Sequence, residues 1–239
     1  MSATQSQIDE FIIESNDQKR TVDASTSIVT FDYYEDIFSP TVTAIAKISN
    51  SNESIAPGNS QGEADGYKQS IYNGLPLRGG ERVTVKIGAN SETNVDLDFS
   101  NSSDYLYVSS ITDVISESQR EFFTLHLTSR EAITNETTRV SRRYGSETSI
   151  DTSVKKILKD VLKTKKFTDE SIERSVNNYG FIGNLRKPFT VLIWLASKAV
   201  PAISKDSTAG FVFYQTKDGF NFRSIDSLLS QKSKAAYMY

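Results

Sequence analysis

Residues Tyr105–Ile133 read YLYVSSITDVISESQREFFTLHLTSREAI, and this stretch decides the fold of the chain. Two long runs of alternating apolar residues meet at a short polar turn, and the second run ends in a charged Ser-Arg-Glu sequence. Period-two alternation places Phe123, Leu125 and Leu127 on one strand face. The pattern predicts a long two-stranded ribbon with a polar tip. Because no nucleophile–base pair, metal cluster or phosphate loop accompanies it, the stretch favours a structural or assembly protein over an enzyme.

The composition is that of an ordinary folded protein. The chain has 239 residues, of which 37% are hydrophobic and 24% charged, enough for one large or two small domains with a sizeable core. A net charge of −3 argues against a dedicated nucleic-acid-binding protein, which is normally basic. The absence of cysteine excludes a disulfide framework and a thiolate metal site.

The sequence suggests neither a signal peptide nor a membrane-spanning helix. The first residues, MSATQSQIDEF, lack the basic start and apolar core of a signal peptide. The longest apolar run, at 191–196, is far shorter than the ~20 residues that a bilayer-spanning helix needs. The sequence therefore predicts a soluble protein made in the cytoplasm, without a membrane partner.

The first half of the chain reads as β structure. Alternating apolar and polar residues at 29–33, 42–48 and 82–87 predict half-buried strands. Six or seven strands are expected before residue 133, enough for a small barrel or sandwich. The polar stretch 50–66 is long for a loop inside a compact domain, and we expect it to be mobile or ordered by a partner.

The apolar period changes to a helical one after Ser141. Residues 154–162 follow the i, i+3, i+4, i+7, i+8 spacing of an amphipathic helix whose other face carries lysines. A second short helix is expected at 168–176, since acids occupy its first turn. Pro188 suits the first turn of a third helix, 188–200, which is apolar nearly all round and is expected to be buried, Trp194 included.

The chain returns to β structure near its C-terminus. Aromatic runs at 211–214 and 220–223 flank Asp218-Gly219, a strong hairpin signal. The fold class predicted from this order is mainly β with an α insert (α+β). We expect an antiparallel tube-type β-barrel formed by residues 1–133 plus 209–239, with residues 134–208 as an inserted helical subdomain.

Isolated polar residues offer weak signals for chemistry. His126 is the single histidine, so a structural or surface role is expected rather than a metal site. Asp96 and Asp98 lie on one side of a strand and could supply the paired carboxylates of a glycoside hydrolase, yet acids at i, i+2 on a wet strand face are commonplace. We therefore expect no catalytic residues, no metal site and no cofactor.

Two groups of basic residues have both a functional and a structural interpretation. Gly79-Gly80 between Arg78 and Arg82 could cradle a phosphate, but no helix or phosphate-loop motif follows, and a hairpin turn is the favoured interpretation. The other group combines the lysine face of residues 151–166 with three nearby arginines, Arg139, Arg142 and Arg143. A solvated helix face is the default there, and an electrostatic contact with DNA or an acidic partner is the alternative.

With these segments in place, the chain resembles the central baseplate hub proteins of contractile-tailed phages, particularly those of T-even-like phages of cyanobacteria. The resemblance rests on the Tyr105–Ile133 stretch and on four further ones: YYEDIFSP at 33–40, LPLRGGERV at 75–83, YGFIGNLRKPFTVLIWLASKAVP at 179–201 and FVFYQTKDGFNFRSID at 211–226. The last two also resemble the hub region of related injection machines, including type VI secretion spikes. Their order along the chain carries the match, and none is a catalytic motif.

The resemblance implies a trimeric ring at the tail tip, in which two tube-like barrels per subunit match the sixfold tail tube. Implied partners are further copies of the chain, the tail tube protein, the central spike protein and the baseplate wedge proteins, with DNA only passing through the lumen. The implied location is the virion, after assembly in the host cytoplasm. Such hubs usually continue into a second barrel and a spike-binding domain. Neither is evident by Tyr239, so we expect the second barrel in another polypeptide or in a further C-terminal part.

The sequence thus predicts a non-enzymatic structural hub component whose Tyr105–Ile133 ribbon extends a sheet between subunits. The expected contact is the ribbon tip, formed by Ser116, Glu117, Ser118, Gln119 and Arg120. One alternative is another structural class, namely a hexameric tail-tube protein, a wedge component or a sheath-terminator-like protein. Two further alternatives are a tail-tip glycan hydrolase that uses Asp96 and Asp98 and a carbohydrate- or receptor-binding β module.

Overall fold

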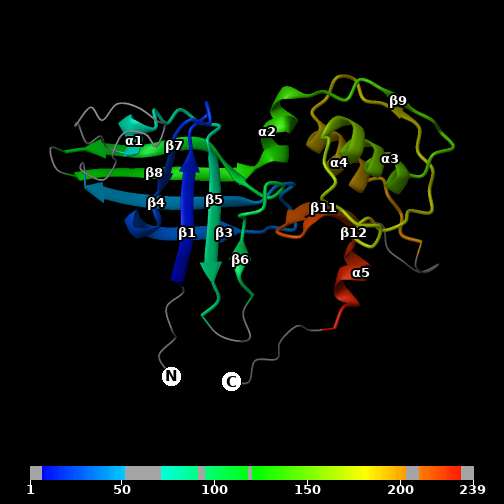
Figure 1. Cartoon of the computed structure of the whole chain (residues 1–239). Helices are drawn as coiled ribbons and strands as arrows, with labels where there is room; N and C mark the ends of the chain where they lie inside the picture. The colour runs from blue at the N-terminus through cyan, green and yellow to red at the C-terminus, as the bar shows by residue number, and fades with distance from the viewer. Residues whose placement is uncertain (1–6, 52–70, 91–94, 118–119, 203–209, 233–239) are drawn as a thin grey trace. The chain divides into compact units, whose positions relative to one another are not determined.

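The computed structural model describes residues 7–51, 71–90, 95–117, 120–202 and 210–232 (Figure 1). The chain divides into two compact units. Unit 1 comprises Met1–Tyr34 and Thr43–Arg130, and unit 2 comprises Glu35–Val42 and Glu131–Tyr239. The predicted loop at 50–66 lies almost entirely outside the described residues.

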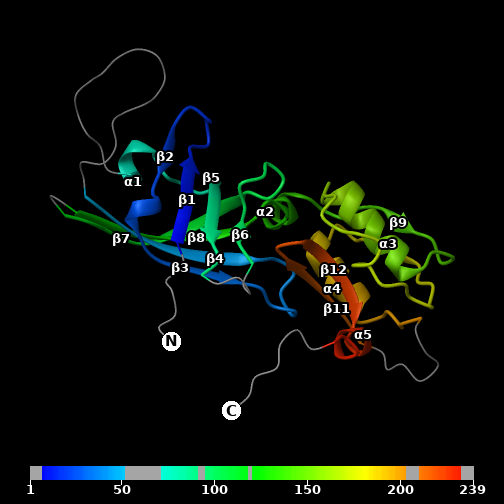
Figure 2. The same ribbon diagram turned by 60° about the horizontal axis from the view of Figure 1, so that its bottom comes forward.

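Unit 1 is one antiparallel sheet. Its eight strands are β1 (Gln7–Glu14), β2 (Thr21–Asp23), β3 (Ile28–Tyr34), β4 (Thr43–Ser51), β5 (Arg82–Gly88), β6 (Leu97–Asp98), β7 (Leu106–Ser116) and β8 (Arg120–Ser129). The strand order is β2-β1-β5-β7-β8-β4-β3, and β6 pairs with β5 outside this path. A short 3-10 helix (Ser25–Ser27) and the one-turn helix α1 (Ile71–Gly74) complete the unit. In Figure 2, β1, β2 and β5 stand at an angle to β3, β4 and β8, so the sheet curls into an incomplete barrel.

The inner face of this sheet forms the core of unit 1. Alternate residues of β4, β5 and β8 turn inward, as period-two patterning requires, and are at most 2% exposed; they are Ala44, Ala46, Ile48, Val83, Val85, Phe123, Leu125 and Leu127. The predicted fold class, mainly antiparallel β with helices added, is confirmed. Strand β1 was not predicted, although its Phe11 and Ile13 are fully buried.

Unit 2 combines short helices with two small sheets. Its helical segments are α2 (Arg130–Thr137), α3 (Ile150–Lys156), the π-helical turn Ile157–Val161, α4 (Pro188–Ala196) and α5 (Ile225–Leu229). Strands β9 (Arg143–Tyr144) and β10 (Phe181–Ile182) form one two-stranded sheet, and β11 (Phe211–Thr216) pairs with β12 (Gly219–Ser224) in the other. No helix among the described residues is both long and apolar enough to cross a membrane.

Aromatic rings dominate the core of unit 2. The rings of Phe213 and Phe220 stack at 5.6 Å across the predicted β11–β12 hairpin, and those of Phe211 and Phe222 stack at 4.7 Å. Phe189 of α4 lies against both members of the first pair, with ring centroids 6.1 Å away. These rings and the apolar side of α3 form one buried cluster, which confirms the helical spacing predicted for residues 154–162.

The hairpin therefore belongs to unit 2. Among the described strands, β11 and β12 pair with each other and not with the sheet of unit 1; Phe222 of β12 also bridges Ile172 of unit 2, and the rings of the hairpin pack against α4. This division differs from the expected return of residues 209–239 to the barrel. The physical reason is that Phe211, Phe213, Phe220 and Phe222 bury their rings in the helical core.

Two helix predictions need correction. Residues 168–176 are not helical, because Ser171 and Glu173 exchange backbone hydrogen bonds with Phe222 instead of forming a helix. The helix predicted at 188–200 ends at Ala196 and is not buried all round, since Ile193 is 46% and Trp194 38% exposed. Helix α4 therefore has one core face and one surface face.

Candidate assembly surfaces

The predicted β7–β8 ribbon is present in unit 1, and its two ends differ. At the end near α2, Leu106, Val108 and Leu127 are 1% exposed. There β7 also pairs with β5, through Tyr107 opposite Arg82 and Leu106 opposite Val83. This end of the ribbon is therefore part of the core sheet.

The outer part of the ribbon remains in the sheet on its β8 side, since β8 pairs with β4 as far as Ser51 opposite Arg120. From Ser109 to Ser116, β7 has β8 as its one strand partner within the described part of the chain. Ile115 lies opposite Phe122, and these apolar side chains remain 54% and 37% exposed. Register irregularities on either side of Ser110–Thr112 interrupt the ladder, and Asp113 adopts φ 53°. Among the described residues, β7 thus offers an edge without a second strand partner and a small apolar face, while its bulges limit unspecific edge pairing.

The ribbon tip holds the contact residues predicted from the sequence. Ser116, Glu117 and Arg120 are exposed there, and the backbone N–H of Glu117 donates to the carbonyl of Arg120 at 2.8 Å. Ser118 and Gln119 lie outside the described residues. The structure therefore places three of the five predicted contact residues together at the tip.

The backbone N–H groups of the Arg-Gly-Gly turn already bind a carboxylate of the same chain. The carboxylate of Glu81, which is 1% exposed, accepts the backbone N–H of Arg78 at 2.7 Å and that of Gly79 at 2.9 Å. The side chain of Asn16 donates to the same carboxylate at 3.0 Å. Because these donors already bind Glu81, the turn is a structural connection from α1 into β5 rather than a phosphate cradle, and it does not join two strands of a hairpin as predicted.

The other isolated polar candidates have structural partners. Nε2 of His126 lies 3.1 Å from Oγ1 of Thr112 on the neighbouring strand. Asp96 accepts the backbone N–H of Ala89 at 2.8 Å, and Asp98 accepts the N–H of Ser100 at 2.8 Å. Within the described ranges, no three His, Asp or Glu side chains gather as a metal site. Asp96 and Asp98 act as loop-fixing acceptors in this geometry.

Several basic residues of unit 2 are paired within the unit. Arg142 pairs with Asp160 at 2.9 Å, and Lys155 pairs with Asp169 at 2.5 Å. The hydrogen bond from Lys155 lowers the pKa of the Asp169 carboxyl. Lys187 likewise hydrogen-bonds Glu136 and lowers its pKa. Two members of the predicted basic group, Arg142 and Lys155, are thus paired within the unit, which favours a structural role for these two side chains.

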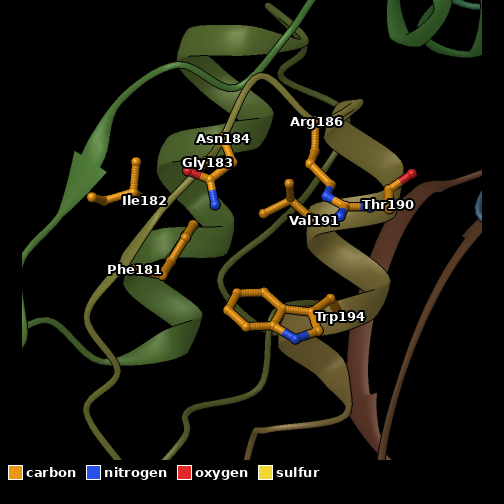
Figure 3. A pocket seen from close by; sticks show the side chains of 8 residues that line it. All are labelled: Phe181, Ile182, Gly183, Asn184, Arg186, Thr190, Val191 and Trp194. Carbon is orange, nitrogen blue, oxygen red and sulfur yellow. The ribbon is translucent and has the colours of Figure 1, made fainter.

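A pocket of about 360 Å³ opens between β10 and α4 (Figure 3). It is lined by Phe181, Ile182, Gly183, Asn184, Arg186, Thr190, Val191 and Trp194. The Trp194 ring meets Phe181 edge-on at 5.6 Å, and Phe181 stacks on Tyr144 at 4.5 Å. The pocket is therefore an aromatic surface feature, which the sequence prediction of a buried Trp194 had missed.

A second apolar feature is the turn before β4. Ile37 is 45% and Phe38 77% exposed on it. The turn is fixed by Asp36, whose carboxylate accepts the backbone N–H of Phe38 at 2.8 Å and whose carbonyl accepts that of Ser39 at 3.0 Å. Two adjacent apolar side chains are thus presented on an ordered turn.

No protein-family model matches the sequence, and no curated protein matches it. Solved structures do resemble the fold. A 43 kDa tail protein of prophage MuSo2 from Shewanella oneidensis has a TM-score of 0.53 at 7% identity, over 90% of this chain and 54% of that one. A component of the type VI secretion system of Escherichia coli, described as structurally similar to the T4 bacteriophage tail proteins gp27 and gp5, has a TM-score of 0.50 at 11% identity, over 93% and 50%. The chain thus spans about half the length of each, and the likeness shows a shared fold.

Proposed function

We propose that this chain is a non-enzymatic structural component of a contractile phage tail. In particular, it acts as a hub that forms a ring at the tail tip, joins the tail tube to the central spike and lets DNA pass through its lumen. The observation that carries the proposal is the fold likeness, which covers at least 90% of this chain and includes a phage tail protein and a type VI secretion component.

The ribbon gives this role a physical means. An open strand edge lets a neighbouring subunit continue the sheet through backbone hydrogen bonds. The exposed Ile115–Phe122 pair adds apolar area beside the tip, and large aromatic side chains contribute strongly to interfaces. We infer that Ser116–Arg120 and this pair form the contact between subunits.

The proposed partners follow from the position of a hub. They are copies of the chain, most simply as a trimer, together with the tail tube, central spike and wedge proteins of a virion. A tail-tube protein is the second candidate, because a curled sheet whose β7 edge has no second strand partner among the described residues also suits a hexameric ring. The two candidates differ in copy number and in position along the tail axis.

The test is a cryo-electron-microscopy map of intact tails that carry this chain with a small terminal tag. A hub gives three copies in one ring, on the axis, at the junction of tube and spike. Six copies in each of many stacked rings would show a tube protein instead. Density at the periphery of the baseplate would overturn both candidates.

A further inference from the structure

We propose that the pocket between β10 and α4 binds the Glu35–Phe38 turn of a second copy of this chain. Both features belong to unit 2, and both expose apolar side chains on ordered backbone. The proposal identifies the segment that binds in the pocket, and it adds a contact between subunits that is separate from the ribbon. It rests on the proposed ring function only for the number of copies that close the ring.

The turn is a rigid projection. The carboxylate of Glu35 accepts the backbone N–H of Lys217 at 2.6 Å, which ties the start of the turn to the β11–β12 hairpin. Its end is held by the backbone N–H of Val42, which donates to the side chain of Gln215 at 3.4 Å. Between these anchors, Phe38 is 77% exposed. Since the turn is already ordered, docking its phenyl ring costs little further conformational entropy.

The pocket has matching size and walls. Its 360 Å³ lies near the lower end of volumes found for ligand sites, about 300–1,000 Å³, so it suits one or two side chains rather than a large ligand. Trp194 and Phe181 form an aromatic wall, and Ile182 on the rim is 60% exposed. A phenyl ring entering here gains edge and face contacts with other rings.

The rim of the pocket is held in an unusual backbone conformation. Asn184 and Leu185 adopt φ 48° and 55°, a region that side-chain-bearing residues rarely occupy. Backbone hydrogen bonds fix the loop, including those between Val140 and Leu185 and between Val140 and Arg186. A Cβ atom on Gly183 would lie 2.3 Å from the carbonyl oxygen of Val140, so this close approach requires glycine. Such over-determined strain is typical of preformed binding surfaces.

Opposite charges on the pocket and the turn support this choice of partner. The guanidinium of Arg186 lies among the pocket-lining side chains beside Thr190 and Val191 (Figure 3), and no ion pair engages it in the described part of the chain. The turn carries Asp36 two residues before Phe38, and one Asp36 oxygen is taken by the turn itself. An aromatic ring with a nearby carboxylate therefore meets aromatic rings with a guanidinium, a pairing that arginine favours.

Turn and pocket are different surface patches, so the contact is head-to-tail. Head-to-tail contacts repeat from copy to copy and close into rings when the rotation allows. This geometry agrees with a ring-forming subunit and does not depend on the ribbon contact.

Because the chain has no cysteine, a cysteine introduced by substitution is the one thiol that can react with a crosslinker. Ile37→Cys chains, which keep the Phe38 ring, are mixed with differently tagged Thr190→Cys chains and treated with a short bismaleimide linker. We expect a covalent heterodimer at least about tenfold more abundant than with Val95→Cys, a 78% exposed control in unit 1, in place of Ile37→Cys. Equal yields for the two pairs would overturn the proposal.

Charge variants of Arg186 in the same assay identify the contact. Arg186→Asp in the Thr190→Cys chain should lower the heterodimer yield about tenfold, which corresponds to ~1.4 kcal/mol. Arg186→Lys, which keeps the positive charge, should retain most of the yield. A yield that Arg186→Asp leaves unchanged would overturn the assigned pairing. Because purified chains are used, failure here leaves the copy number in intact tails, and hence the hub proposal, to be judged by the tail map.

Discussion

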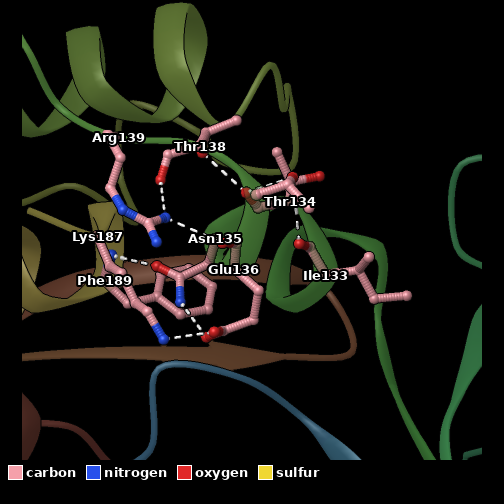
Figure 4. Close-up of polar contacts among 9 residues, drawn as sticks. Ile133, Thr134, Asn135, Glu136, Thr138, Arg139, Lys187 and Phe189 are labelled. Carbon is pink, nitrogen blue, oxygen red and sulfur yellow. Dashed lines mark hydrogen bonds and ion pairs between the residues drawn. The ribbon is translucent and has the colours of Figure 1, made fainter. Parts of the chain in front are cut away.

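The backbone N–H of Phe189 donates a 2.8 Å hydrogen bond to the side-chain oxygen of Asn135, and both residues are at least 93% buried (Figure 4). Asn135 lies in α2, and Phe189 lies in the first turn of α4, where backbone N–H groups have no partner within the helix. The amide nitrogen of Asn135 donates in turn to Glu136 at 3.1 Å. The side chain of Asn135 thus joins α2 to α4 through a hydrogen bond between two residues that are 54 positions apart in the chain.

Asn135→Ala should destabilise unit 2 by about 1–3 kcal/mol, because the N–H of Phe189 would remain buried without an acceptor. Urea unfolding followed by the fluorescence of Trp194 reports on this unit. Asn178→Ala, at an exposed asparagine of the same unit, is the matched control and should change stability by less than about 0.5 kcal/mol. Equal effects of the two substitutions would contradict the assigned role.

Gly219→Ala should destabilise the β11–β12 hairpin more than an exposed glycine substitution does. Gly219 adopts φ 132°, and an added Cβ would lie 2.4 Å from the carbonyl oxygen of Lys166. Both backbone strain and a steric clash therefore oppose alanine, and a loss above about 2 kcal/mol is expected. Gly145→Ala, whose Cβ would have no neighbour nearer than 3.4 Å, is the control. Thermal unfolding of both variants distinguishes the two sites.

Glu81→Ala should loosen the turn that precedes β5. The substitution removes the buried acceptor of the Arg78 and Gly79 N–H groups, with an expected loss of about 1–3 kcal/mol in unit 1. Hydrogen exchange of these two amides should rise with it. Asp32→Ala, at an exposed acid of β3, should leave both amides protected. Unchanged exchange in Glu81→Ala would show that the carboxylate does not hold the turn.

Tyr144 and Tyr214 should lose their phenolic protons at a higher pH than an ordinary tyrosine does. Burial raises the pKa of Tyr144 and of Tyr214 above the ordinary 10.0. A raised folded-state pKa means that stability is fully present below pH ~10 and falls as the pH rises further, because the unfolded chain releases these protons first. Phenolate absorbance should therefore show a late component that comes from Tyr144 and Tyr214. Tyr144→Phe should remove one late transition, and an unaltered late amplitude would refute the assignment.

Phe122→Asp should block assembly without unfolding the chain. Phe122 is 37% exposed on the outer ribbon, so the isolated chain should still fold, with a loss of about 1–2 kcal/mol from the Ile115 pairing and the low strand propensity of aspartate. In the proposed ring it would bury a charge, and incorporation into tails should be lost. Immunoblotting of purified tails measures incorporation, with Val95→Asp at another exposed position as the control. Normal incorporation of Phe122→Asp would exclude this part of the ribbon from the contact.

The sequence predicted the ribbon and the hairpin because period-two alternation and turn chemistry are local properties. Strand β8 buries the residues that the pattern places on one face, and β11 and β12 flank the predicted turn. The Asp-Gly signal was displaced by one position, since Lys217 and Asp218 form the loop and Gly219 already belongs to β12. That shift follows from the close approach of Gly219 to Lys166, which is a tertiary contact.

The tertiary structure decided what local pattern could not. Residues 168–176 have helix-compatible spacing, yet hydrogen bonds with Phe222 hold them in an irregular conformation. Trp194 lies in an apolar helix but borders a pocket, since only one face of α4 finds neighbours in the core.

From the sequence alone, the mainly β class and the long ribbon were predictable, because both depend on the alternation of neighbouring residues. The ribbon ends at Ser129, however, and the predicted exit at Arg130–Ile133 belongs to helix α2. Only the tertiary structure decided which strand edge stays open, that the hairpin joins the helical unit, and that the pocket and the Phe38 turn reach the surface. These outcomes depend on contacts between residues far apart in the chain, and a local pattern does not encode which partners meet.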